Sequence, residues 1–214
     1  SAFFVSAAAY ARQGGMNRRK AGEDFYFLNK IFQLGHITEV NTTCVIPSAR
    51  PSDRVLFGTG PEVKKLSEQP EKEYRVYHPQ YFDMLRSFFH SGLSELYSAG
   101  LDEIKSIVNQ HPVILKEFLK AINIEKEMER LKANCATEKT FRKQFFHWFN
   151  GLRIIQFMHS AHKDDKDKLP VTEAAKILLQ KLNIHSSSDD PMEMLNIFRM
   201  KERNSARTIS NPQQ

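Results

Sequence analysis

The sequence has few cysteines, which stabilise many secreted proteins, and no long apolar run of the kind that spans a membrane. Cys44 and Cys135 are the two cysteines among 214 residues, too few for a disulfide framework, which favours a reducing compartment. No apolar run approaches the roughly 20 residues that cross a bilayer, and the residues before Gly14 lack the charged leader and apolar core of a signal peptide. We therefore expect a cytoplasmic protein, free or at the inner face of the membrane, with no transmembrane segment.

The usual short motifs for nucleotides and metals are also missing. The sequence has no Gly-Lys-Ser/Thr of a Walker loop and no Gly-x-Gly-x-x-Gly dinucleotide fingerprint. His159 and His162 are three residues apart, but no carboxylate or cysteine completes a ligand set at a matching spacing. We expect no metal site made by this chain alone.

What the sequence does have is a large apolar content and an uneven positive charge. Hydrophobic residues make up 41%, with 16 Phe, which predicts a folded globular protein. The net charge is +6, and residues 1–66 hold nine Lys and Arg against five Asp and Glu. This local excess favours a small anionic ligand such as a phosphate. Basic and aromatic residues do not alternate along any expected strand, so a nucleic-acid partner is not expected.

The pattern predicts an α+β fold that is mostly α-helical, with a small strand-containing segment at the start. Ala2–Ser6 is apolar and strand-like. A helix then opens near Glu23 or Asp24 and ends at Gly35, which suits a left-handed C-terminal position. Ile37–Ile46 is rich in Thr, Val and Ile and predicts one extended or twice-broken strand.

Beyond the polar segment Ser67–Lys72 the sequence predicts a helical bundle, which sets domain limits of 1–66 and 67–214. Apolar residues recur there at helical spacing. The stripes are Leu115, Phe118, Leu119 and Ile122 after Pro112, then Phe141, Phe145, Trp148, Leu152 and Ile155, with Phe146, Phe149 and Phe157 on a second face. Two more helices are expected, at Val171–Leu182 and from the capping pattern that begins at Asp190.

The best candidate for chemistry is the carboxylate pair Glu23-Asp24, at the mouth of the expected helix and just after the Gly14-Gly15 turn. Unpaired amides and the macrodipole at a helix N-terminus stabilise negative charge, so the pair could be an ordinary cap. A carboxylate kept ionised there, facing a glycine turn, could instead accept a proton from an attacking hydroxyl. Both interpretations stay open at this point.

A second candidate is the loop that carries Arg50 and Arg54 and is followed by Gly58-Thr59-Gly60. The arginines are four residues apart, and the Gly-Thr-Gly turn offers backbone N–H donors, so together they could hold a diphosphate. The alternative is a solvated connection, stiffened by proline, whose arginines pair with nearby carboxylates.

The order of these pieces resembles the second half of the family-2 glycosyltransferases with a GT-A fold, over roughly residues 1–66. The resemblance rests on Gly14-Gly15-Met16, Ala21-Gly22-Glu23-Asp24, Phe25-Tyr26-Phe27-Leu28-Asn29-Lys30, Gly35, Pro47-Ser48-x-Arg50-x-Ser52-x-Arg54 and Gly58-Thr59-Gly60. It implies inverting transfer of a sugar from a nucleotide-sugar donor to a glycan or other hydroxyl acceptor. Asp24 matches the family's base, Glu23 its neighbour, and Gly14 and Gly15 the turn before the acceptor site.

The resemblance also implies that the nucleotide-binding half, with its Asp-x-Asp metal motif, lies before residue 1. The strand-like start without Met agrees with this expectation. The chain would then be an incomplete, inactive part of an enzyme that uses a divalent cation, Mg or Mn, bound mostly by residues outside this chain. Arg50 and Arg54 would assist with the leaving diphosphate, and residues 67–214 look like the helical extension of a bacterial branch.

The alternative is a non-catalytic helical module that binds another protein or a membrane surface. In that case Glu23-Asp24 is only a helix cap.

Overall fold

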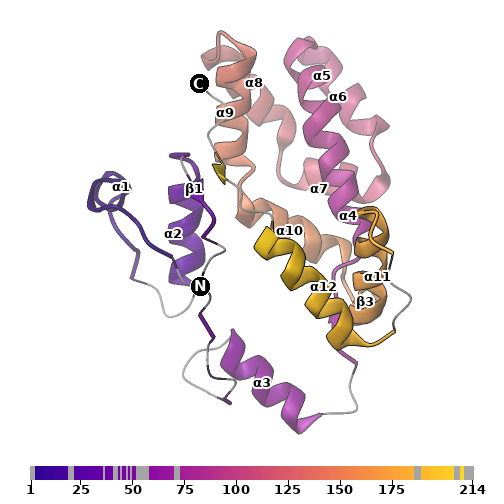
Figure 1. Cartoon of the computed structure of the whole chain (residues 1–214). Coiled ribbons are helices and arrows are strands. Elements are labelled where there is room, and N and C mark those ends of the chain that lie inside the picture. The colour runs from indigo at the N-terminus through magenta and orange to yellow at the C-terminus, as the bar shows by residue number, and fades with distance from the viewer. Residues whose placement is uncertain are drawn as a thin grey trace. The chain divides into compact units, whose positions relative to one another are not determined.

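The computed structural model of the protein describes residues 3–18, 22–35, 37–40, 43, 45–46, 48, 50–51, 58–69, 73–185, 189–204 and 208–209. The described chain is mostly helical, which confirms the expected class. It divides into two compact units, one of residues 1–74 with 187–214 and one of residues 75–186, whose elements are labelled in Figure 1. The predicted domain limit between residues 66 and 67 lies inside a helix, Thr59–Glu68.

The first unit joins two segments that are far apart in the sequence. Its elements are α1 (Ala7–Arg12), α2 (Glu23–Phe32), β1 (Ile37–Thr38), α3 (Thr59–Glu68), α12 (Pro191–Asn204) and β4 (Thr208–Ile209). The two strands pair antiparallel, with Ile37 opposite Ile209 and Thr38 opposite Thr208. The unit therefore needs both of its segments to be complete.

Several predictions for the first unit can be compared with the structure. The helix start at Glu23 and the left-handed Gly35, with a φ of +73°, are confirmed. The strand predicted at Ala2–Ser6 is wrong over its described part, because Phe3–Ser6 belong to no strand and Ser6 begins α1. The side chain of Ser6 accepts a hydrogen bond from the Ala9 amide at 3.2 Å, as an N-cap does.

The strand predicted over Ile37–Ile46 is also shorter than expected. Within its described residues only Ile37 and Thr38 are paired, and Glu39 and Val40 continue without a partner strand. A β-rich composition does not make a strand where no neighbouring strand takes its backbone hydrogen bonds.

The second unit is a bundle of short helices with one small sheet. Its elements are β2 (Arg75–Val76), α4 (Gln80–Ser87), the π-helical turn η1 (Phe88–Gly92), α5 (Leu93–Ser98), α6 (Leu101–Gln110), α7 (Val113–Ala121), α8 (Ile124–Asn134), α9 (Glu138–Trp148), α10 (Gly151–Ala161), the 3-10 turn η2 (Asp165–Asp167), β3 (Leu169–Pro170) and α11 (Val171–Lys181). Strands β2 and β3 pair antiparallel. Helices α4, η1 and α5 follow one another without an intervening residue.

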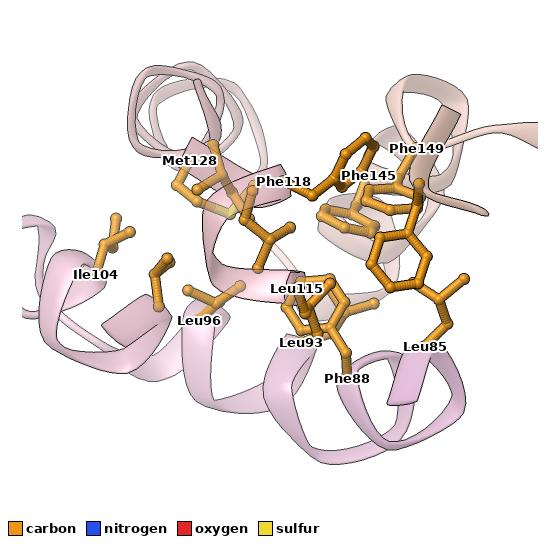
Figure 2. Packing of buried hydrophobic residues seen from close by; sticks show 14 of the residues in the cluster. Leu85, Phe88, Leu93, Leu96, Ile104, Leu115, Phe118, Met128, Phe145 and Phe149 are labelled. Atoms are coloured by element: carbon orange, nitrogen blue, oxygen red, sulfur yellow. The ribbon is translucent and has the colours of Figure 1, made fainter. Parts of the chain in front are cut away.

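Aromatic side chains fill the centre of the second unit (Figure 2). Phe88 from η1 and Phe145 from α9 are fully buried, with ring centroids 6.1 Å apart. Phe145 also stacks on Phe149 at 5.6 Å and 13°. Burying each such side chain contributes about 1.5–3 kcal/mol relative to leaving it in water. This cluster is the main source of stability for the unit.

The predicted stripes place most of the core correctly, but they put the exposed Phe146 on an apolar face and miss one helix end. On α7, Leu115, Phe118 and Leu119 are buried as expected. The second stripe predicts continuous helical spacing from Phe141 to Ile155, whereas the structure ends α9 at Trp148 and starts α10 at Gly151. The side chain of Asn150 accepts from the Leu152 amide at 3.0 Å and starts the new helix.

Candidate functional site

The Gly14-Gly15 turn closes the C-terminal end of α1. Both glycines have left-handed φ angles, +68° and +70°. The Gly15 amide donates to the Tyr10 carbonyl at 2.9 Å and the Gly14 amide donates to the Ala11 carbonyl at 3.0 Å. These two bonds are those of a Schellman motif, which satisfies the last carbonyls of a helix. The glycine turn thus has a structural role of its own.

Gly15 is the more constrained of the two glycines. It is buried, and a Cβ atom built on it would lie 2.9 Å from Cε1 of Tyr10, closer than real contacts allow. A Cβ on Gly14 would meet nothing within 4 Å. The Tyr10 ring therefore packs directly against the backbone of the turn.

The carboxylate pair lies in the first turn of α2, as predicted. Gly22 precedes it in the left-handed conformation, with a φ of 73°. Glu23 is exposed and Asp24 is partly buried. The Phe25 amide donates to Oδ1 of Asp24 at 2.7 Å. This short bond and the helix dipole both favour a negative charge on Asp24.

Lys30 and Phe27 hold the glycine turn against α2. Nζ of Lys30 donates to Oδ1 of Asn17 at 2.9 Å and approaches the Gln13 and Gly15 carbonyls at 3.4 and 3.5 Å. The ring of Phe27, only 1% exposed, lies 5.3 Å from the ring of Tyr10 in α1. Lys30 belongs to the residues that carry the sequence resemblance, but no role was predicted for it. Its place three residues after Phe27, on the same helical face, is the signal that could have identified it.

The glycine turn packs on α2 and the carboxylate pair belongs to α2, but the two lie at different parts of this helix. The side chain that bonds the turn, Lys30, is six residues after Asp24, a separation of about 9 Å along an α-helix. The structure therefore brings Gly14 and Gly15 to the later half of α2 and places Asp24 at its start.

The predicted diphosphate loop is only partly described. Arg50 is exposed, and Arg54 lies outside the described residues, so their joint role stays a prediction. The Gly58-Thr59-Gly60 segment is not an open turn. Gly58, with a φ of 118°, is the N-cap of α3, and Thr59 and Gly60 form its first turn.

The described residues do not form a cation site. No group of three or more His, Cys, Asp or Glu among them could hold a metal ion, and the residues around Glu23-Asp24 add no further ligand of these kinds. Asp165-Lys166-Asp167 has the Asp-x-Asp spacing, but it forms the turn η2, where Oδ2 of Asp167 accepts the Asp164 amide at 3.1 Å. The divalent cation stays an expectation for a longer protein.

His162 and His111 have structural roles in the second unit. His162 is buried, its Nδ1 lies 2.7 Å from the Met158 carbonyl, and its Nε2 accepts the His78 amide at 2.9 Å. His111 packs edge-on against Phe88 at 5.2 Å, and its Nε2 is buried with no hydrogen-bond partner among the described residues. Burial lowers the pKa of His111, although the nearby Glu95 opposes this shift. A neutral ring fits this apolar setting.

One surface pocket of about 410 Å³ lies in the second unit, beside α8 and Trp148. Arg130 donates to Glu127 within it, so their charges largely compensate each other. Arg153 lies over the Trp148 ring, 5.2 Å from its centroid. Lys126 and Glu129 also line the pocket, so its wall carries charges of both signs.

Comparison with models of protein families, with curated proteins and with solved structures finds no match. Among the described residues, no helix is both long and apolar enough to cross a membrane. The arguments for function therefore come from the residues themselves.

Proposed function

We propose that this chain is the second half of an inverting family-2 glycosyltransferase, with Asp24 as its general base and Glu23 beside it. The observation that supports the proposal is that a two-glycine turn packs on the helix whose first turn holds adjacent carboxylates, with the turn at the later half of that helix. Lys30 and Phe27 fix that packing. The resemblance expects both elements next to the acceptor site.

The chemistry requires a base, an acceptor and a stabilised leaving group. Asp24 takes the proton of the acceptor hydroxyl while its oxygen attacks the anomeric carbon. The bond to the nucleoside diphosphate breaks, and the diphosphate leaves with the bonding electron pair. Because attack and departure occur on opposite faces, the anomeric configuration inverts.

The bond from the Phe25 amide does not prevent Asp24 from acting as a base. An ionised carboxylate offers about four lone-pair sites on two oxygens. Phe25 uses one of these sites, and a hydrogen-bonded carboxylate can still take a proton from a hydroxyl. The bond also fixes the direction of the carboxylate.

Positive groups of this chain would stabilise the leaving diphosphate. Arg50 and Arg54 supply guanidinium groups, and the first turn of α3 at Gly58, Thr59 and Gly60 supplies backbone amides. A divalent cation, when bound, would add a Lewis acid for the same charge.

The test uses a longer protein that contains this chain and turns over a nucleotide sugar, with release of nucleoside diphosphate as the readout. Asp24→Asn removes the base, and we expect a loss of about 100-fold or more in kcat. The matched control is Glu39→Gln, at an exposed carboxylate of the same unit, with activity within about twofold. Near-normal transfer by Asp24→Asn would show that the base is elsewhere.

A second candidate function, a non-catalytic helical interaction module, is favoured by two of the same contacts. The Phe25 amide bond to Asp24 stabilises the start of α2, and the Schellman motif accounts for Gly14 and Gly15 without a ligand. In that case Asp24→Asn weakens α2, as amide hydrogen exchange would detect, and changes no transfer activity.

A further inference from the structure

A surface of exposed aromatic and basic side chains crosses two helical segments of the second unit. Phe82 on α4 is 51% exposed and Phe146 on α9 is 39% exposed. Phe89 of η1 packs against Phe146, with the two ring centroids 5.2 Å apart. Phe82 and Phe89 are seven residues apart, which puts them close to one helical face.

Cations accompany these rings on both segments. Arg86 is exposed and lies four residues after Phe82 and three before Phe89. On α9, Arg142 and Lys143 precede Phe146 by four and three residues, and Nη2 of Arg142 donates to the Phe89 carbonyl at 3.0 Å. We call this surface the aromatic–basic face. Its members are Phe82, Arg86, Phe89, Lys139, Arg142, Lys143 and Phe146.

The carboxylate on this part of α9 is already engaged. Oε1 of Glu138 accepts a hydrogen bond from the Ser94 hydroxyl at 3.0 Å and lies 3.8 Å from Nη1 of Arg142. Asp83 of α4, next to Phe82, is engaged as well, because it pairs with Lys181 of α11. The aromatic–basic face therefore keeps an excess of positive charge, with four cations against two carboxylates, and Arg86 and Lys143 are exposed among these cations.

We propose that the aromatic–basic face binds the surface of an anionic lipid bilayer. Phenylalanine has no hydrogen-bonding group, so Phe82 and Phe146 gain from entering the boundary between headgroups and acyl chains. Lysine and arginine beside them gain from the negative surface potential of anionic lipids. A nucleic acid or an acidic protein would also pair with the cations, but it would offer the exposed phenyl rings less apolar surface to pack against.

This proposal is independent of the catalytic role of Asp24, since every residue of the aromatic–basic face belongs to the second unit. Failure of one proposal leaves the other standing. Asp24→Asn should bind vesicles as the unchanged chain does.

The test is co-sedimentation of the full chain with vesicles of phosphatidylcholine containing about 30% phosphatidylglycerol, compared with phosphatidylcholine alone. We expect binding to the anionic vesicles that weakens as salt is raised, because exposed charges are screened. Each cation near the surface should contribute about fivefold in affinity. The double variant Lys143→Glu with Phe146→Ser should lose at least about tenfold.

A matched control changes an apolar and a basic residue on another helix. Leu101→Ser with Lys105→Glu alters two exposed side chains of α6 and should leave vesicle binding within about twofold. Because Phe146 packs on Phe89, a second variant, Phe82→Ser with Arg86→Glu, keeps the test valid if the first unfolds. Equal affinity for the two kinds of vesicle, or a short DNA duplex bound while anionic vesicles are not, would overturn the proposal.

Discussion

At the residue scale, the candidate site depends on a close approach between one glycine and one aromatic ring. Gly15 accepts the Tyr10 ring against its backbone, and the same ring packs on Phe27 of α2. A Cβ atom at this position would force the Tyr10 ring to move. Gly14 shares the left-handed conformation but has no such neighbour.

We predict that Gly15→Ala destabilises the first unit more than Gly14→Ala does. Both variants lose about 1–2 kcal/mol of stability, because alanine is strained in the left-handed conformation. Gly15→Ala also bears the cost of moving the Tyr10 ring. Hydrogen exchange of the α2 amides, followed by mass spectrometry, measures the difference. Equal protection in the two variants would mean that the Tyr10 contact contributes nothing.

At the element scale, helix starts were predictable where a local signal marks them. Helices begin as expected at Glu23, at the Pro112–Val113 junction and at Pro191. These starts were predictable because caps and first-turn preferences depend on neighbouring residues only. The break at Asn150 was missed because the apolar spacing continues across it. The boundary between α9 and α10 follows the cap at Asn150 and not the apolar spacing that continues across it.

The candidate site was predictable in part for the same reason. The glycine turn and the carboxylate pair follow from short local patterns. The contact of Lys30 with Asn17 joins residues 13 positions apart and depends on how α1 packs on α2. A spacing rule within one helix carries no information about such a contact.

We predict that Asn150→Ala costs about 1 kcal/mol of stability in the second unit, because the Leu152 amide loses its acceptor. Urea unfolding followed by the fluorescence of Trp148, the single tryptophan, measures the change. Asn150→Asp keeps an acceptor and is the control, expected to lie close to the unchanged protein. A loss as large in Asn150→Asp would point to a cause other than the cap.

At the scale of the whole molecule, the two units are built differently. Residues 75–186 form one continuous segment whose aromatic cluster lies within it. The first unit is discontinuous, because β1 in residues 1–74 pairs with β4 in residues 187–214. The aromatic core of the second unit therefore draws on no residue outside residues 75–186.

We predict that residues 75–186 fold alone. The fragment should show helical circular dichroism and a cooperative transition by Trp148 fluorescence, with a midpoint within about 5 °C of that in the whole chain. Residues 1–74 alone, which lack β4 and α12 and contain no tryptophan, are compared by circular dichroism and should show no cooperative transition. A fragment of residues 75–186 that melts without cooperativity would contradict the division into units.

The pairing of β1 with β4 has a consequence for the order of events on the ribosome. Because synthesis runs from the N-terminus, Ile37 emerges early and must wait for Ile209, while the intervening bundle can already condense. The segment that carries Glu23 and Asp24 is thus made before the bundle and completed after it, so a nascent chain acquires its bundle before its carboxylate-bearing unit is complete.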